Sequence, residues 1–166
     1  MNVPANDPAL RSWIPVTADS DFPIQNLPLG VGSWNGEPPV PLTRVGDVIV
    51  DLSILADSGL LDSTGIPREA FVAPHLNELM KGGAASVRGL RARLSELLRL
   101  DNAELRDDST LREDALLPPE QVTMHLPVTV GDYTDFYSSR DHATNVGTMF
   151  RDPANALLPN WLHLPV

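Results

Sequence analysis

The segment VGDVIVDL, residues 45–52, is the strongest indication of the fold. Its Gly-Asp pair is followed by alternating and β-branched residues, a pattern typical of the turn and second arm of a β-hairpin. The preceding segment FPIQNLPLGVGSWNGEPPVP, residues 22–41, has no helical period and repeatedly places an apolar residue beside Pro or Gly. That pattern indicates strands joined by tight turns. Together the two segments predict a β-rich domain in the first part of the chain.

Two helices are expected, both in the middle of the chain. Pro74 precedes the stretch 75–81 and Gly82-Gly83 follows it, so proline stands at the favoured helix start and glycine just past the end. From Ser86 to Leu100, leucines recur at 3.6-residue spacing and arginines occupy the other face, which predicts an amphipathic helix. The charged segment 101–114 has few apolar residues and is expected to form an exposed loop or linker.

The charge balance restricts the class of partner. The chain carries 22 acidic against 12 basic residues, a net charge of -10, so it would repel a phosphate backbone and an anionic membrane surface. We therefore expect no nucleic-acid and no membrane partner. A small anionic substrate is still compatible with this charge, because a local arginine or a bound cation can reverse the field inside a pocket.

The compartment and the extent of the chain are also expectations from sequence. Cysteine is absent, so disulfides and thiolate chemistry are excluded. The N-terminus lacks the basic start and apolar core of a signal peptide, and no apolar run approaches the roughly 18 residues of a membrane span, which favours a cytoplasmic protein. The last residues, NALLPNWLHLPV, would expose several apolar side chains together, so we expect more chain to follow in the complete protein.

The segment GDYTDFYSSRDHATNVGTMFR, residues 131–151, holds the densest cluster of reactive side chains. Asp135 offers oxygen ligands for a hard cation, but one carboxylate cannot form a Ca²⁺ or Mg²⁺ site alone. His142 has the chemistry of a general base, and Tyr137 and Arg151 have that of a carboxylate-binding pair. Each residue also has an ordinary structural interpretation, as a turn carboxylate, a loop histidine, a half-buried aromatic or a solvated cation. Residue types alone leave both interpretations open.

Two stretches resemble a known family, the fumarylacetoacetases (fumarylacetoacetate hydrolase family). They are SWIPVTADSDFPIQNLPLGVGS, residues 12–33, and the whole of residues 131–166, beginning GDYTDFYSSRDH. The resemblance implies a mainly β fold with two short helices. Its N-terminal SH3-like β-barrel domain would cover residues 1–118, and residues 119–166 would begin a catalytic domain built as a mixed β-sandwich or β-roll.

The resemblance also implies an activity. Members of the family hydrolyse a carbon–carbon bond of 4-fumarylacetoacetate, a small dicarboxylate diketone, to fumarate and acetoacetate in tyrosine and phenylalanine catabolism. The complete enzyme uses Ca²⁺ and Mg²⁺ and is a homodimer. By resemblance Asp135 matches a metal ligand and His142 the base that activates water, while Tyr137 and Arg151 match residues that bind substrate. The other metal ligands would lie beyond Val166, so the isolated chain is expected to be inactive.

Two other functions compete with this interpretation. The chain could be a non-catalytic interaction module derived from the family's N-terminal domain, although such a module would have no physical need for the polar cluster around His142. It could also belong to a related acylpyruvate hydrolase, which the extended N-terminal domain argues against.

Overall fold

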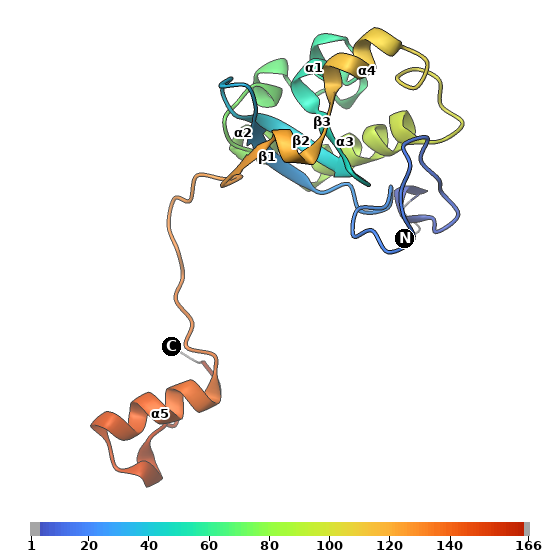
Figure 1. The fold of residues 1–166 in the computed structure, drawn as a ribbon. Helices are drawn as coiled ribbons and strands as arrows, with labels where there is room; N and C mark the ends of the chain where they lie inside the picture. Colours follow the sequence, from blue (N-terminus) through green and yellow to red (C-terminus); the bar gives the residue numbers. More distant parts are fainter. Residues whose placement is uncertain (1–3, 165–166) are drawn as a thin grey trace. The chain divides into compact units, whose positions relative to one another are not determined.

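The computed structural model describes residues 4–164 and divides the chain into two compact units, residues 1–129 and 130–166 (Figure 1). The strands are β1 (Leu29–Ser33), β2 (Val40–Val45), β3 (Val48–Asp51), β4 (Leu116–Leu117) and β5 (Thr123–His125). The α-helices are α1 (Leu52–Asp57), α2 (Asn77–Lys81), α3 (Gly83–Leu98), α4 (Ser109–Ala115) and α5 (Arg140–Phe150). Short 3₁₀ helices are η1 (Pro4–Asn6), η2 (Asp62–Thr64), η3 (Arg68–Phe71), η4 (Pro119–Gln121) and η5 (Pro153–Asn155).

The first unit is built on a five-stranded antiparallel sheet in the order β4-β3-β2-β1-β5. The expected hairpin is confirmed: β2 and β3 pair from Leu42↔Asp51 to Val45↔Val48 around a turn at Gly46. Gly46 has a φ of 53°, and an added Cβ would lie 2.6 Å from the Pro15 carbonyl oxygen, so the turn requires glycine. The mainly β N-terminal domain is therefore confirmed. Its sheet is open within residues 4–164, because β4 and β5 stay at opposite edges where a closed barrel would pair them.

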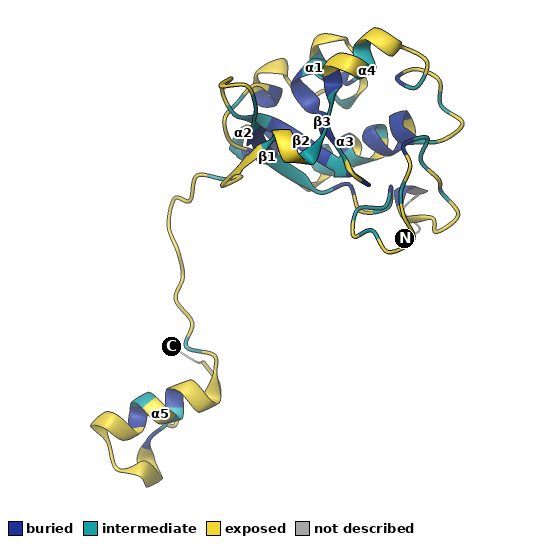
Figure 2. Ribbon diagram, in the orientation of Figure 1, coloured by how far each residue is buried: buried dark blue, intermediate teal, exposed yellow. Residues whose placement is uncertain are grey.

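The core of the first unit lies between one face of this sheet and helices α1, α2, α3 and α4. Val31, Val45 and Val50 supply the sheet side, and all three are fully buried. Helix α3 presents a buried stripe to the same core: Leu90, Leu94, Leu97 and Leu98. Figure 2 shows the buried colour concentrated on this inner surface. The amphipathic helix predicted from the 3.6-residue spacing of leucines is thus confirmed, and its leucine face packs in the core.

The two helices expected from sequence are both present, as α2 and α3, and the structure adds three more. Helices α1 and α4 have only six and seven residues, too short to display a helical period in sequence. The segment 101–114 was expected to be a loop, but its last residues belong to α4. The Asp108 carboxylate caps the N-terminus of this helix by accepting a hydrogen bond from the Leu111 N–H at 3.0 Å. The expectation of only two helices was therefore too low.

Helix α1 begins at a buried carboxylate. The Asp51 side chain, 2% exposed, accepts hydrogen bonds from the Ser53 backbone N–H and from Ser53 Oγ, both at 2.7 Å. Burial raises the pKa of Asp51, and the hydrogen bonds from Ser53 and Ile54 oppose that rise. This aspartate is the helix cap that joins strand β3 directly to α1.

The first compact unit continues past Pro118, the residue at which the resemblance implies that the N-terminal domain ends. Strand β5 pairs with β1, from Val31↔His125 to Ser33↔Thr123. The Asn77 side chain then holds Thr129, donating to its carbonyl at 3.0 Å and accepting from its N–H at 2.9 Å. The division into residues 1–118 and 119–166 as family domains stays a prediction. Across the described residues, no helix combines the length and apolar character needed to span a bilayer.

Candidate active site

The second unit carries all four candidate site residues, and helix α5 organises it. The helix begins at Arg140 because Ser139 caps it: the Ser139 Oγ accepts a hydrogen bond from the His142 N–H at 3.3 Å. His142 is consequently held in the first turn of the helix. Residues 130–139 form no strand, so Asp135 and Tyr137 do not lie on a common strand face.

The segment that follows η5 packs closely against the backbone of α5. Ala143 and Gly147 are buried and lie four residues apart, on the same side of the helix. A Cβ added at Gly147 would lie 2.1 Å from the Ala156 carbonyl oxygen, so only glycine permits this approach. Arg151, directly after the helix, donates from Nη1 to the same Ala156 oxygen at 3.2 Å. The segment after η5 is therefore attached to the helix along its last turns.

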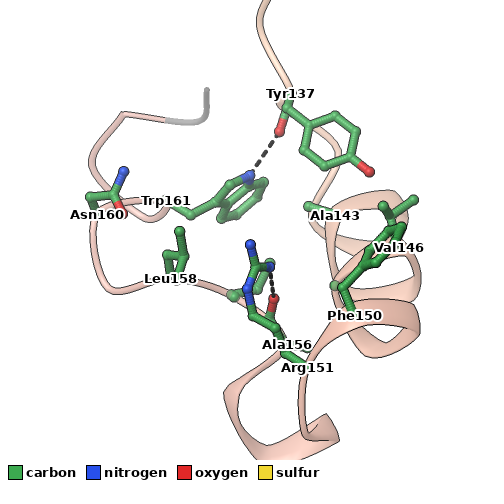
Figure 3. Close-up of a pocket in the computed structure, with 11 residues that line it drawn as sticks. Tyr137, Ala143, Val146, Phe150, Arg151, Ala156, Leu158, Asn160 and Trp161 are labelled. Carbon is green, nitrogen blue, oxygen red and sulfur yellow. Dashed lines mark hydrogen bonds between the residues drawn. The ribbon is translucent and has the colours of Figure 1, made fainter.

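A pocket of about 160 Å³ lies between α5 and the returning segment (Figure 3). Its walls are mostly apolar, with Tyr137 and Arg151 among the polar contributors. The Trp161 indole Nε1 donates to the Tyr137 carbonyl oxygen at 2.9 Å and so connects the two ends of the unit. The principal lining residues are Tyr137, Ala143, Gly147, Arg151, Leu158 and Trp161.

Tyr137 also contacts the candidate base. Its ring and that of His142 lie 4.9 Å apart between centroids at an interplanar angle of 72°, an edge-to-face contact. This arrangement restricts the imidazole on one side while leaving it otherwise exposed. Three of the four predicted site residues are thus brought together: Tyr137 and Arg151 line one pocket, and His142 packs on Tyr137.

Asp135 is separate from that group. It is exposed, it does not line the pocket, and its carboxylate has no hydrogen bond or ion pair to any residue between 4 and 164. Nowhere in that range do three His, Asp or Glu side chains gather as a metal site. An unengaged carboxylate suits one ligand position of a hard cation, but the donors within residues 4–164 do not complete a coordination shell of six to eight oxygens.

Four residues that shape the site were missed by sequence reasoning. The capping role of Ser139 could have been found, because serine just before a helical segment is a start signal. The small pair Ala143 and Gly147, four apart, is a weaker signal of close packing. Trp161 was expected only as part of an exposed apolar run, and its hydrogen bond to Tyr137 depends on a contact across 24 residues.

The chain thus holds an antiparallel β domain followed by a small unit that carries Tyr137, His142 and Arg151, and comparison with known proteins identifies its family. The family model Fumarylacetoacetase N-terminal matches residues 25–127, so the chain belongs to the fumarylacetoacetase N-terminal family.

Named relatives extend the similarity through the candidate site. The chain is 53% identical over 156 residues to fumarylacetoacetase of Homo sapiens, covering 93% of this chain and 37% of the relative. It is 44% identical over 160 residues to that of Caenorhabditis elegans and 40% identical over 159 residues to that of Arabidopsis thaliana, covering in each case 95% of this chain and 38% of the relative. The chain therefore spans little more than a third of the length of the relatives it matches.

Proposed function

We propose that this chain forms the N-terminal part of a fumarylacetoacetase and supplies part of its active site for hydrolysis of a carbon–carbon bond of 4-fumarylacetoacetate. The supporting observation, in a chain of this family, is that Tyr137 and Arg151 line one pocket while His142 packs on Tyr137. Hydrolysis here means that a water oxygen bonds to the carbonyl carbon. The adjacent carbon–carbon bond then breaks, and its electron pair leaves with acetoacetate as the enolate.

His142 is the proposed base. A neutral imidazole beside the substrate takes a proton from the attacking water as the new carbon–oxygen bond forms. The edge-to-face contact with Tyr137 limits rotation of the ring, and the cap from Ser139 holds the backbone of His142 in the first helical turn. Both contacts reduce the orientational freedom that would otherwise be lost during the reaction.

Arg151 and Tyr137 are the proposed substrate-binding groups. The Arg151 guanidinium donates one hydrogen bond to the Ala156 carbonyl, which anchors it at the pocket wall. A guanidinium has five N–H donors, so several stay available for a substrate carboxylate in a two-point contact. The Tyr137 hydroxyl can donate to a second substrate oxygen.

Asp135 is the proposed contribution to a divalent-cation site, with Ca²⁺ or Mg²⁺ as the ion. A cation bound there would supply positive charge that stabilises the oxygen of the leaving enolate. One carboxylate is too few for such a site, so the other ligands must come from protein outside this chain, and the isolated chain should not turn over substrate. In the complete protein we propose the homodimeric state that the resemblance implies.

A chimera tests the proposal directly. The corresponding N-terminal segment of the human fumarylacetoacetase is replaced by this chain, and loss of 4-fumarylacetoacetate is followed in the presence of Ca²⁺ or Mg²⁺. The chimera should be active, and this chain alone should be inactive. A chimera that is folded by circular dichroism and retains the assembly state of the parent, yet has no hydrolase activity, would contradict the proposal and favour a non-catalytic module.

A further inference from the structure

A second pocket, unrelated to the candidate active site, lies on the outer face of the sheet in the first unit. Its volume is about 290 Å³. Cross-strand pairing places Gly30 opposite Leu42 and Arg44 opposite Ile49, so these four residues share one face of the sheet. Val31, Val45 and Val50 face the core on the opposite side. The pocket is therefore separate from the hydrophobic core.

Missing side chains on strand β1 create the hollow. Gly30 and Gly32 are two apart and point to this face, where a strand would ordinarily carry larger residues. The space at Gly32 is filled, because an added Cβ would lie 2.6 Å from both Leu42 Cδ2 and Val122 Cγ1. The space at Gly30 is bounded only by flexible side-chain ends, Met124 Cε at 3.0 Å and Leu42 Cδ1 at 3.4 Å. Glycine at position 30 thus leaves a recess between β1 and β5.

Arg44 is the one charged residue among the described residues that line this pocket. The remaining lining residues are Phe22, Pro28, Leu29, Gly30, Leu42, Ile49, Pro119 and Met124. The Arg44 guanidinium carbon lies over the Phe22 ring, 4.0 Å from its centroid, in a cation–π contact. Its Nε donates to the Gly46 carbonyl at 2.9 Å. The arginine is consequently pre-positioned and only 29% exposed.

The counter-charge on Arg44 is replaceable. Asp47 Oδ1 accepts from Arg44 Nη2 at 3.1 Å, but the Asp47 side chain is 87% exposed. Exposed pairs of this kind contribute about 0–1 kcal/mol, so a carboxylate that also buries apolar surface can displace Asp47. Arg44 Nη1 has no hydrogen-bond acceptor within residues 4–164 and is available to a ligand.

We propose that this pocket binds a small organic carboxylate with a compact apolar body. The carboxylate pairs with Arg44, and the apolar part lies on Leu42, Ile49 and Met124 in the recess beside Gly30. Charge complementarity selects an anion, because the lining contains one cation and no acidic residue. The planar guanidinium selects a carboxylate, which it meets in a two-point hydrogen bond. The inference is independent of the proposed hydrolase function.

The test uses this chain with a matched pair of probes, naphthalene-2-carboxylate and naphthalene-2-carboxamide, followed by calorimetry and by backbone amide shifts in the NMR spectrum. The carboxylate should saturate a single site with a Kd of about 1 mM or below, as expected for a ligand of this size. The shifts should centre on Gly30, Leu42 and Arg44. The uncharged carboxamide should bind at least about tenfold more weakly, the ratio that one lost charge-assisted contact produces.

Variants separate binding from a structural role of Arg44. Asp47→Asn removes the competing carboxylate and should tighten carboxylate binding about two- to fivefold, within the range for an exposed ion pair, whereas Glu113→Gln on α4 should not. Arg44→Gln should abolish the preference for the anion, with Arg88→Gln as the charge-matched control. Gly30→Ala should weaken the binding of both probes, because its methyl group fills the recess. Gly89→Ala is the control, since its added Cβ would have nothing within 4 Å, and it should weaken the binding of neither probe.

Three results would overturn the proposal. They are the absence of saturable binding, equal affinity for the two probes, and an unchanged carboxylate affinity in the folded Asp47→Asn variant. The last result matters most, because a purely structural Arg44 would tolerate Asp47→Asn without any gain in affinity.

Discussion

The rings of Tyr137 and His142 meet edge to face, with centroids 4.9 Å apart and planes at 72°. The two residues are five positions apart, and the contact forms because helix α5 begins between them, at the Ser139 cap. Tyr137, which is predicted to bind substrate, therefore contacts His142, the predicted base. The contact places two roles, assigned by resemblance, at one location.

His142→Gln in the human chimera should lower kcat by about 10²- to 10⁴-fold, the usual contribution of a general base, with a smaller effect on KM. His163→Gln, which changes another exposed histidine, should leave both quantities unchanged. A variant that retains normal kcat would assign His142 a structural role.

Asp135→Asn in the chimera should raise the Ca²⁺ or Mg²⁺ concentration needed for half-maximal turnover. The amide keeps the shape and removes the charge of one ligand, and a shift of at least about 10- to 100-fold is expected, since loss of even outer partners of metal ligands has that effect. Asp132→Asn is the matched control, because it neutralises a neighbouring exposed carboxylate. Equal metal dependence in the two variants would show that Asp135 is not a ligand.

The isolated chain should bind Ca²⁺ no better than a generic acidic surface. It carries a net charge of -10, yet the part described by the structure holds no group of three acidic or histidine side chains suited to a metal. Calorimetric titration should therefore show weak, salt-sensitive binding without a defined stoichiometry. A one-to-one site of micromolar affinity would contradict this expectation.

Gly147→Ala should loosen the second unit. The new Cβ would lie 2.1 Å from the Ala156 carbonyl oxygen, so the returning segment must move away from α5. Overpacking of this kind costs about 1–3 kcal/mol, which should appear as faster amide hydrogen exchange over α5 and a shifted Trp161 indole N–H signal. Gly131→Ala, where an added Cβ has nothing within 4 Å, should change neither measurement.

Asp51→Asn should stabilise the first unit at neutral pH relative to the unsubstituted chain, because burial raises the pKa of the aspartate in the fold. The folded state then holds the Asp51 proton more tightly than the unfolded state. The contribution of Asp51 to the free energy of unfolding is therefore unimpaired below the unfolded-state pKa, and it falls as pH rises through the higher folded-state pKa. The asparagine can still accept from the Ser53 N–H and carries no charge to desolvate.

The check is chemical denaturation of both proteins across the acidic range. The stability difference should grow in favour of the Asp51→Asn variant as pH increases and should vanish at the acidic end. Asp51→Ala, which removes the cap altogether, should be about 0.5–2 kcal/mol less stable than the Asp51→Asn variant at every pH, since neither side chain titrates. A stability difference between the unsubstituted chain and the Asp51→Asn variant that does not change with pH would show that the burial of Asp51 has no effect on its ionisation.

The sequence by itself determined the strongest local elements and the choice of candidate site residues. The hairpin around Gly46 and the helix α3 could be predicted, because a turn glycine and a 3.6-residue leucine period are local patterns in the sequence. The residues Asp135, Tyr137, His142 and Arg151 were selected by resemblance before any geometry was known. Short helices such as α1 could not be predicted, because a few residues are too short a segment to show a helical hydrophobic period.

Only the tertiary structure decided which distant residues meet. The approach of Ala156 to Gly147, the Trp161 bond to Tyr137 and the addition of β5 to β1 all join segments without a shared local pattern. The recess at Gly30 likewise exists only because β5 pairs with a strand, β1, that has glycines on that face. Such contacts depend on how much surface each segment can bury against another, a property of the folded chain that no local window of sequence contains.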